Sequence, residues 1–376
     1  MLRLAFRQLL SEPWRTLMTC CAIGAAVAVI LLLEGFQQGL LIQLREAVLN
    51  RGADLIVTQS GVSNFIGSRS LLPQLSRRRI EAVAGVKAAH PMTLVPVIYE
   101  QAGEMRPIFF VVYDTAGGPA RLSAGREVRK PREIVIDESL AQFYRLAPGD
   151  PFVVADYEFR IAGIAQQASA FFTAFAFINY DDMIDFYFDS DLVGDISNLP
   201  LLSYLLVELE PGVDRNVIRP LIEAAEPAGD VYTPQQIANN DMALGRTLFG
   251  PVLGVMIGAG YVIALLVVGM IMFAVAHGRL RSLGVLKALG FTNGALSREM
   301  VLEAVALSLL ALPVALLLAQ AASGMIETQA PLYLVPVAEP GPLLRTLLGA
   351  MLLAIVGALL PLRYIARLDP AIVFRG

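Results

Sequence analysis

The sequence predicts a membrane protein that is α-helical, with four transmembrane helices and an α+β extracytoplasmic domain inserted between helices 1 and 2. Two observations lead to this prediction. The 376 residues are 56% hydrophobic and 16% charged, with a mean hydropathy of +0.61, which is more apolar and less charged than an average soluble domain. The long charge-free apolar runs are confined to the N-terminal part and the last third of the chain. A more polar domain therefore interrupts a membrane domain.

The membrane helices follow from length and absence of charge. A helix needs about 20 apolar residues to satisfy its backbone across the hydrocarbon of a bilayer. Four segments meet this demand, approximately Leu17–Leu33, Leu248–Ala276, Ala304–Ile326 and Thr346–Leu362. The first and last are short, so we expect these helices to run past the bilayer or to lie where it is locally thin.

The orientation follows from the basic residues beside these helices. Short segments rich in Lys and Arg stay in the cytoplasm, and three such segments flank the helices: Arg3, Arg7 and Arg15 at the start, Arg279, Arg281, Lys287 and Arg298 between helices 2 and 3, and Arg363, Arg367 and Arg375 at the end. Both termini are therefore expected in the cytoplasm of a bacterial cell, with the chain crossing the inner membrane. The long inserted domain translocates largely regardless of its charge and is expected outside.

The inserted stretch has the pattern of an α+β domain. Runs rich in Val, Ile and Phe, bounded by Gly, Pro and Asp, predict strands at Asp54–Thr58, Val86–Tyr99, Ile108–Tyr113, Phe152–Ala155, Phe159–Ile164 and Tyr204–Leu209. Helices are expected between them at Leu72–Val83, Glu138–Tyr144, Tyr180–Phe188 and Asp214–Ala225, with Asp214 as an N-cap. At roughly 190 residues, the domain is long enough to bury its own core.

The chain divides accordingly into nine parts. We expect a cytoplasmic amphipathic helix over residues 1–16, helix 1 with an outward extension over 17–49, the extracytoplasmic α+β domain over 50–234, a stalk with helix 2 over 235–276, a cytoplasmic loop over 277–299, helix 3 over 300–326, a short outer loop over 327–342, helix 4 over 343–362 and a cytoplasmic tail over 363–376.

The sequence offers little for catalysis. His90 and His277 are its two histidines, no metal-binding spacing of Cys or His occurs, and no Gly-x-Ser-x-Gly motif is present. Cys20 and Cys21 are adjacent inside an apolar run, so they cannot form a disulfide framework. No lysine follows glycine as a phosphate-binding loop requires. A net charge of −4 without a basic stripe also argues against nucleic acid. We therefore expect a non-catalytic chain that binds neither a metal nor a nucleic acid.

The loop between helices 2 and 3 is the most informative segment. Its leucines recur at helical spacing with basic residues around them, which predicts a short amphipathic helix ended by Gly290: Leu280, Leu283, Leu286 and Leu289, with Arg279, Arg281 and Lys287. Such a helix would lie along the membrane or in the groove of a partner. A solvated basic connector is the alternative on amphipathicity alone.

The residues of this loop resemble those of the MacB/FtsX superfamily of ABC transporter permeases, the four-helix type VII class. That family typically has Arg-Glu-Ile-Gly-Leu-Leu-Arg-Ala-Leu-Gly where this chain has Arg281-Ser-Leu-Gly-Val-Leu-Lys-Ala-Leu-Gly290, followed by Leu302-Glu-Ala304. The resemblance extends to the N-terminal segment Leu4–Leu17 and to Pro361, Ala366, Asp369-Pro370 and Phe374-Arg375 near the end. Ser282 replaces the common glutamate, which removes an acidic contact to the ATPase. Leu33–Gln37 and Gly284–Ala288 look closer to the DevC and HrtB exporters than to lipoprotein-releasing members.

The resemblance implies a membrane subunit that does not hydrolyse ATP. ATP and magnesium would bind a separate cytoplasmic ABC ATPase, and no cofactor would bind this chain. Two permeases would pair as a homodimer, with a periplasmic adaptor as a further partner. ATPase contacts are implied for Arg279, Arg281, Ser282, Leu283, Gly284, Val285, Leu286, Lys287, Ala288 and Gly290. Closure of the ATPase would move the helices and the outer domain, and this mechanotransmission would export or handle a hydrophobic or amphipathic substrate. The resemblance does not distinguish among haem, glycolipid, lipoprotein, phospholipid and peptide as that substrate. The alternative is an FtsX-like signal transmitter that activates an extracytoplasmic cell-wall hydrolase.

Three further features each allow two interpretations. Glu34 at the outer end of helix 1, next to Phe36, is a candidate for substrate binding because the family's haem exporters use a glutamate in this region; alternatively it is a headgroup-level carboxylate that meets water. The run Ala170–Ile178 is either a lipid- or partner-touching edge or a buried strand. Arg77–Arg79 either bind lipid phosphates or form a solvated helix face.

Overall fold

The computed structural model describes residues 13–66, 70–101, 104–189, 201–278, 285, 287, 289 and 291–359. The chain forms two compact units. Unit 1 comprises Met1–Gln38, Gly250–Ile326 and Val335–Gly376, and unit 2 comprises Gly39–Phe249 and Glu327–Leu334.

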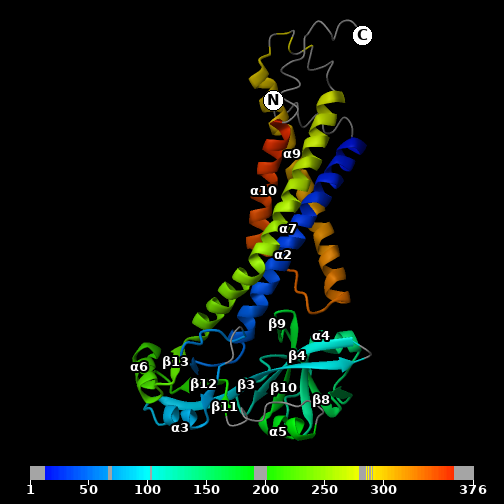
Figure 1. Cartoon of the computed structure of the whole chain (residues 1–376). Helices are drawn as coiled ribbons and strands as arrows, with labels where there is room; N and C mark the ends of the chain where they lie inside the picture. The colour runs from blue at the N-terminus through cyan, green and yellow to red at the C-terminus, as the bar shows by residue number, and fades with distance from the viewer. Residues whose placement is uncertain are drawn as a thin grey trace. The chain divides into compact units, whose positions relative to one another are not determined.

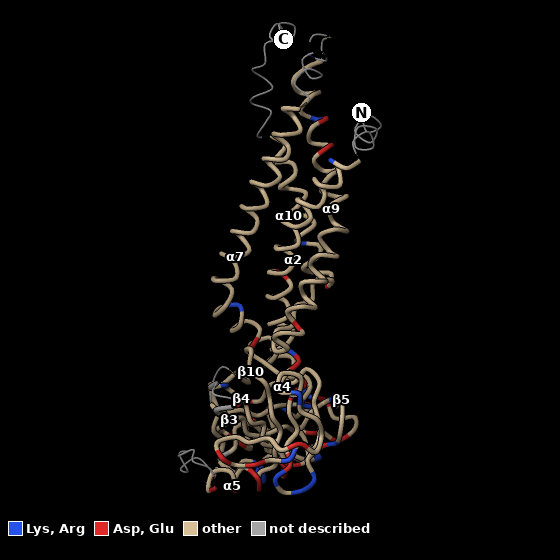
Figure 2. The backbone as a smooth tube through the Cα atoms, turned by 90° about the vertical axis from the view of Figure 1, so that its right-hand side faces the viewer, with Lys and Arg blue, Asp and Glu red and all other residues tan. Residues whose placement is uncertain are grey.

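Within the described part of the chain, four helices contain windows long and apolar enough to cross a membrane: α2 (Pro13–Leu49), α7 (Pro234–Gly278), α9 (Asn293–Gln329) and α10 (Pro340–Leu359). Their parts in unit 1 carry few charged residues (Figure 2). The predicted fold class is confirmed, because the four helices flank an α+β domain that is inserted between the first and second of them (Figure 1).

The helices of unit 1 approach one another closely at small residues. A Cβ atom added to Gly349 of α10 would lie 2.4 Å from Cε1 of Tyr261 on α7, and one added to Gly24 of α2 would lie 3.0 Å from Cγ1 of Val314 on α9. Glycine at such crossings lets backbones pack without a side chain between them, which is a common way for helices to associate in a bilayer. The four helices therefore form one packed bundle.

Unit 2 is built on a mixed sheet of eleven strands with the order β13-β1-β12-β3-β4-β10-β6-β8-β5, in which β7 also pairs with β8 and β9 with β10. The strands are β1 (Leu55–Gln59), β3 (Val86–Gln101), β4 (Glu104–Tyr113), β5 (Leu122–Gly125), β6 (Glu133–Asp137), β7 (Pro151–Val154), β8 (Tyr157–Ala165), β9 (Ser169–Ala170), β10 (Thr173–Asn179), β12 (Tyr204–Leu209) and β13 (Gly229–Tyr232). A separate pair joins β2 (Leu72–Pro73) to β11 (Leu201–Leu202). β10 runs parallel to β4 and β6 parallel to β8, while the other pairs are antiparallel.

Side chains alternate between the two faces of the middle strands, as the period of a strand requires. On one face, Phe110 and Ile178 pack with α4 (Glu138–Tyr144) and α5 (Tyr180–Asp189). On the other face, Val111 and Phe177 share a core with the parts of α2 and α7 that belong to unit 2, represented by Leu44 and Ile237. Helices α3 (Leu75–Glu81) and α6 (Arg215–Ala225) cover the end of the sheet formed by β1, β12 and β13.

Local signals explain where several elements begin. Asp137 accepts a hydrogen bond from Ser139 N–H at the start of α4. The predicted N-cap Asp214 is confirmed, because its carboxylate accepts from Asn216 N–H at 2.8 Å.

Two sequence expectations need correction. The helix predicted over Leu72–Val83 begins at Leu75, because Leu72 and Pro73 pair with Leu201 and Leu202 instead. For the run Ala170–Ile178, the interpretation as a buried strand is confirmed from Thr173 onward, where β10 lies. Ala170 belongs instead to β9, and the chain turns between the two strands at Phe171 and Phe172, both with positive φ (49° and 57°).

Candidate functional site

The coupling segment, residues 277–299, connects the end of α7 to the start of α9. Of the ten residues predicted to contact an ATPase, Val285 and Lys287 are described; Arg279, Arg281, Ser282, Leu283, Gly284, Leu286, Ala288 and Gly290 lie outside the described residues. Leu289 N–H donates to the carbonyl of Val285 at 3.0 Å, which is one turn of α-helix.

The described residues of the coupling segment present apolar side chains to the surface. Val285 is 41% exposed, Leu289 72% and Phe291 42%. Thr292 then caps α9, since its hydroxyl accepts from Ala295 N–H at 3.3 Å. Val285, Leu289 and Phe291, the exposed apolar patch, belong to unit 1. In the same unit, a Cβ atom on Gly278 at the end of α7 would lie 3.2 Å from the Arg15 guanidinium of α2.

Glu34 is buried and ion-paired. Its side chain is only 8% exposed, and its Oε2 accepts a hydrogen bond from Nε of Arg345 on α10 at 2.7 Å. Tightly packed backbone lies beside it, since a Cβ atom on Gly35 would lie 3.2 Å from side-chain atoms of Val335 and Val337. The carboxylate therefore ties α2 to α10 within unit 1. Phe36, the second predicted binding residue, is half-buried on α2.

A groove of about 1080 Å³ lies in unit 2 over β3 and β4, between α3 and α5. Its floor is apolar and includes Leu94 and Phe109, while Arg78 and Arg129 lie among its polar residues. Its volume is at the upper end of the range for small-molecule sites. This groove could not be predicted from the sequence, because its lining residues come from segments far apart in the chain.

The arginine run on α3 is largely engaged. Arg77 donates to Glu81 at 3.1 Å, and Arg79 lies 3.3 Å from the buried carboxylate of Glu226. Arg78 is exposed and faces the groove without a partner among the described residues. Most of the run therefore stabilises the domain, and one guanidinium is free for an anion.

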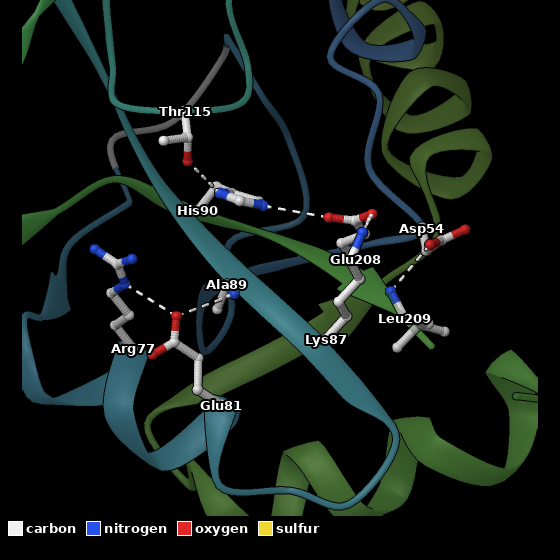
Figure 3. Close-up of polar contacts among 9 residues, drawn as sticks. All are labelled: Asp54, Arg77, Glu81, Lys87, Ala89, His90, Thr115, Glu208 and Leu209. Carbon is white, nitrogen blue, oxygen red and sulfur yellow. Dashed lines mark hydrogen bonds and ion pairs between the residues drawn. The ribbon is translucent and has the colours of Figure 1, made fainter. Parts of the chain in front are cut away.

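A polar network crosses β3 and β12 on the surface of unit 2 (Figure 3). His90 Nδ1 lies 2.7 Å from the Thr115 hydroxyl, and Nε2 lies 3.6 Å from Glu208. Lys87 donates to the other oxygen of Glu208 at 2.6 Å, and this hydrogen bond lowers the pKa of the Glu208 carboxyl. The hydroxyl, imidazole and carboxylate follow one another as in a catalytic triad, but His90 does not line the groove over β3 and β4. The network therefore stabilises a strand pair, and the described residues also contain no cluster of His, Cys, Asp and Glu that could hold a metal ion.

Two protein families match this chain over most of its length. The family model of the MacB-like periplasmic core domain matches residues 16–225, and that of the FtsX-like permease C-terminal region matches residues 254–370. The chain belongs to the MacB/FtsX family of ABC transporter permeases. In this MacB/FtsX permease, Glu34 and the groove fall within the first match, and the coupling segment falls within the second.

Relatives of the permease match it from end to end. It is 24% identical over 380 residues to an uncharacterized ABC transporter permease of Mycobacterium tuberculosis, with all of both chains covered. It is 25% identical over 392 residues to an uncharacterized ABC transporter permease of Mycobacterium bovis, again with full coverage of both chains.

Two solved structures are similar to about half of this chain. The periplasmic region of MacB from Actinobacillus actinomycetemcomitans is 14% identical with a TM-score of 0.37, covering 51% of this chain and 94% of that one. The extracellular domain of the noncanonic ABC-type transporter YknZ from Gram-positive bacteria is 12% identical with a TM-score of 0.34, covering 48% and 100%.

Proposed function

We propose that this permease is the non-catalytic membrane subunit of an ATP-driven transporter in the bacterial inner membrane. A separate cytoplasmic ATPase hydrolyses ATP, and the permease uses that motion to export a hydrophobic or amphipathic substrate or to handle it at the outer leaflet. The observation that carries the proposal is the exposed apolar patch of the coupling segment, formed by Val285, Leu289 and Phe291. Exposed apolar side chains on a short helical turn favour insertion into a partner's groove.

The orientation is proposed from the charges beside the helices. Arg15 and Gly278 lie together in unit 1, so the basic residues before α2 and after α7 belong to the same end of the bundle. Positive residues in short segments favour the cytoplasm. We place both termini and the coupling segment there, and the inserted domain outside.

Mechanical coupling is proposed from the continuity of two helices. α2 has 37 residues and α7 has 45, and both contribute residues to units 1 and 2 without a break in the helix. At about 1.5 Å per residue, 45 residues extend about 68 Å, more than twice the roughly 30 Å of a bilayer's hydrocarbon. A movement of the cytoplasmic ends would reach the inserted domain through these helices.

A second copy of the permease is proposed as a partner. Gly250, Gly254 and Gly258 follow one another at four-residue spacing on α7, and no atom lies within 4 Å of a Cβ added to any of them. Small residues at this spacing favour close pairing of helices in a bilayer. The homodimer would be completed along this stripe.

The substrate is proposed to be amphipathic because the groove of unit 2 combines an apolar floor with the guanidinium groups of Arg78 and Arg129. No cofactor is assigned to this chain, and a periplasmic adaptor would complete the exporter. ATP and magnesium belong to the partner ATPase in this proposal.

The docking proposal is tested by co-purification. The permease is co-expressed with the ABC ATPase encoded beside it, and the double variant Val285→Asp/Leu289→Asp is compared with the wild type. Both side chains are exposed, so aspartate should leave the fold intact but abolish the complex. Val217→Asp on α6, where the valine is 63% exposed, is the matched control and should co-purify normally.

An intact complex with the double variant refutes docking through the coupling segment. A different outcome would favour the alternative function. If the wild type binds the ATPase, no substrate stimulates ATP hydrolysis and the inserted domain recruits a cell-wall hydrolase, the permease is an FtsX-like signal transmitter and not a transporter.

A further inference from the structure

The groove over β3 and β4 leaves apolar surface in contact with water. Leu94 of β3 and Phe109 of β4 belong to its floor, and both are only half-buried. Ile184 of α5 also lines the groove and is 43% exposed. Covering apolar surface is favourable in proportion to the area removed from water. A ligand of this groove should therefore have an apolar part.

Positive charge exceeds negative charge among the unpaired side chains that line the groove. Arg77 and Asp114 lie 3.9 Å apart and form an ion pair. The side chains of Arg78 on α3 and Arg129 in the segment before β6 have no partner within the described part of the chain. The remaining carboxylate among the described lining residues is Asp181, in the first turn of α5. Two guanidinium groups against one carboxylate leave the groove suited to an anion.

We propose that this groove binds a single-chain lipid with a terminal phosphate. The chain would cover the apolar floor, and the phosphate would bind the guanidinium groups of Arg78 and Arg129. A phosphate monoester offers three strong acceptor oxygens and close to two negative charges, whereas a carboxylate offers two oxygens and one charge. Guanidinium groups bind phosphate through two parallel hydrogen bonds. The volume of about 1080 Å³ leaves room for a chain beside the head group.

The wall of the groove at Phe65 is held by α7. The fully buried carboxylate of Asp241 on α7 accepts from Phe65 N–H, with 3.1 and 3.2 Å to its two oxygens, and from Nδ2 of Asn64 at 3.2 Å. Nδ2 of Asn240 donates to the carbonyl of Ser63 at 2.9 Å. A lipid against this wall would contact a segment fixed to a helix that we propose to transmit motion. The inference thus names a substrate class for the proposed transporter and rests on that proposal.

Binding is measured by titration calorimetry on the full-length permease in nanodiscs of zwitterionic lipid, without ATPase or nucleotide and with empty nanodiscs as the blank. The probes are inorganic phosphate, butyl phosphate and hexyl phosphate. Each buried CH₂ group should strengthen binding about fourfold. Hexyl phosphate should therefore bind about 15-fold more tightly than butyl phosphate, and inorganic phosphate should bind most weakly. This comparison uses the wild type alone, so misfolding of a variant does not affect it.

The head-group contacts are tested with Arg78→Gln/Arg129→Gln. Both arginines are exposed, so the fold should be retained. The loss of charge-assisted hydrogen bonds should weaken binding of hexyl phosphate by roughly tenfold or more. Arg160→Gln is the matched control, because Arg160 is an exposed arginine of β8 that does not line the groove. It should bind hexyl phosphate as the wild type does.

Four results would overturn the proposal. Absence of hexyl phosphate binding at millimolar concentration excludes the site. Equal affinities for inorganic phosphate and hexyl phosphate mean that the apolar floor does not take part. Hexanoate that binds as tightly as hexyl phosphate replaces the phosphate head group with a carboxylate. Unchanged affinity in Arg78→Gln/Arg129→Gln means that the probe binds elsewhere.

The lipid site and the transporter role can fail separately. A permease that binds hexyl phosphate but does not co-purify with the ATPase keeps the site and loses the role. A permease that forms the ATPase complex but does not bind hexyl phosphate keeps the role and loses this substrate class.

Discussion

Removing the charge of Glu133 should destabilise unit 2 by about 2 kcal/mol. Glu133 begins β6 and is 6% exposed. Arg126 donates to it through both terminal nitrogens, one of them at 2.7 Å from Oε2, and the backbone N–H groups of Arg129 and Lys130 donate to the same Oε2 at 3.0 Å. Four donors therefore converge on one carboxylate. In Glu133→Gln, the amide NH₂ group replaces one acceptor oxygen and faces N–H donors with which it cannot form a hydrogen bond, such as those of Arg126.

The magnitude follows from the pKa of Glu133. The hydrogen bond from Arg126 lowers this pKa from 4.5 to about 2, with further lowering by the two backbone N–H groups and opposition from burial. This difference between the folded and the ordinary pKa corresponds to a contribution of at most about 3 kcal/mol to the free energy of unfolding. The Arg126 side chain is 39% exposed, and solvent screening reduces the value to about 2 kcal/mol.

The pH dependence has a definite sign. A carboxyl whose pKa is lower in the folded state stabilises that state above pH 4.5, its ordinary value, and the stabilisation is lost as pH falls from 4.5 through about 2. The wild type should therefore lose local stability over this window. Glu133→Gln should show less loss there, because it has no carboxyl to protonate at this position.

The assay is hydrogen exchange of the full-length protein in detergent at increasing urea, followed in peptides that cover residues 126–137. Tryptophan fluorescence does not serve, because the single tryptophan, Trp14, lies in unit 1. Glu158→Gln is the control for loss of an exposed carboxylate on the same sheet. Protection in Glu133→Gln equal to that of the wild type at pH 7 would refute the reasoning.

Three predictions concern unit 1. Arg345→Met leaves the buried Glu34 carboxylate unpaired, so it should reduce the free energy of unfolding by about 2 kcal/mol and lower the melting temperature in detergent. If adding Glu34→Gln to this variant does not restore stability, the reasoning fails. Gly349→Leu should prevent the close approach to Tyr261 and unfold the bundle. Gly258→Leu, at a position with open space, should leave the monomer folded and weaken the dimer in a crosslinking assay, and a monomer destabilised as much as by Gly349→Leu would contradict the assignment of an open face.

The sequence predicted the elements that local patterns determine. Glu138–Tyr144 and Tyr204–Leu209 were predicted with the bounds that the structure has, because each combines a period with clear boundaries. It missed β6 and β13, which are short runs of five and four residues, and their strand structure depends on distant partners. β13, for example, pairs with β1 about 170 residues earlier, as the contact between Gln59 and Gly229 illustrates.

The candidate sites show the same limit. Glu34 is identifiable from sequence because a carboxylate among apolar residues is conspicuous, but Arg345, its partner 311 residues away, is not. The hairpin turn at Phe171 and Phe172 was also beyond prediction, since aromatic residues rarely adopt positive φ. Both rings pack against Phe249 of α7, so tertiary contacts stabilise a turn that local preference opposes.

The parts of α2 and α7 that belong to unit 2 contribute to its core, and this burial supports the proposed mechanical coupling. Leu44 is fully buried, and a Cβ atom on Gly245 of α7 would lie 2.5 Å from Leu44 Cδ1, so the two helices touch inside that core. Ile237 of α7 is equally buried in the same cluster. Withdrawing a leucine or isoleucine from such a core costs about 1.5–3 kcal/mol for each side chain. If a helix slid past the sheet, several of these side chains would have to leave the core together. A displacement of either helix would therefore cost less free energy if the domain moved with it.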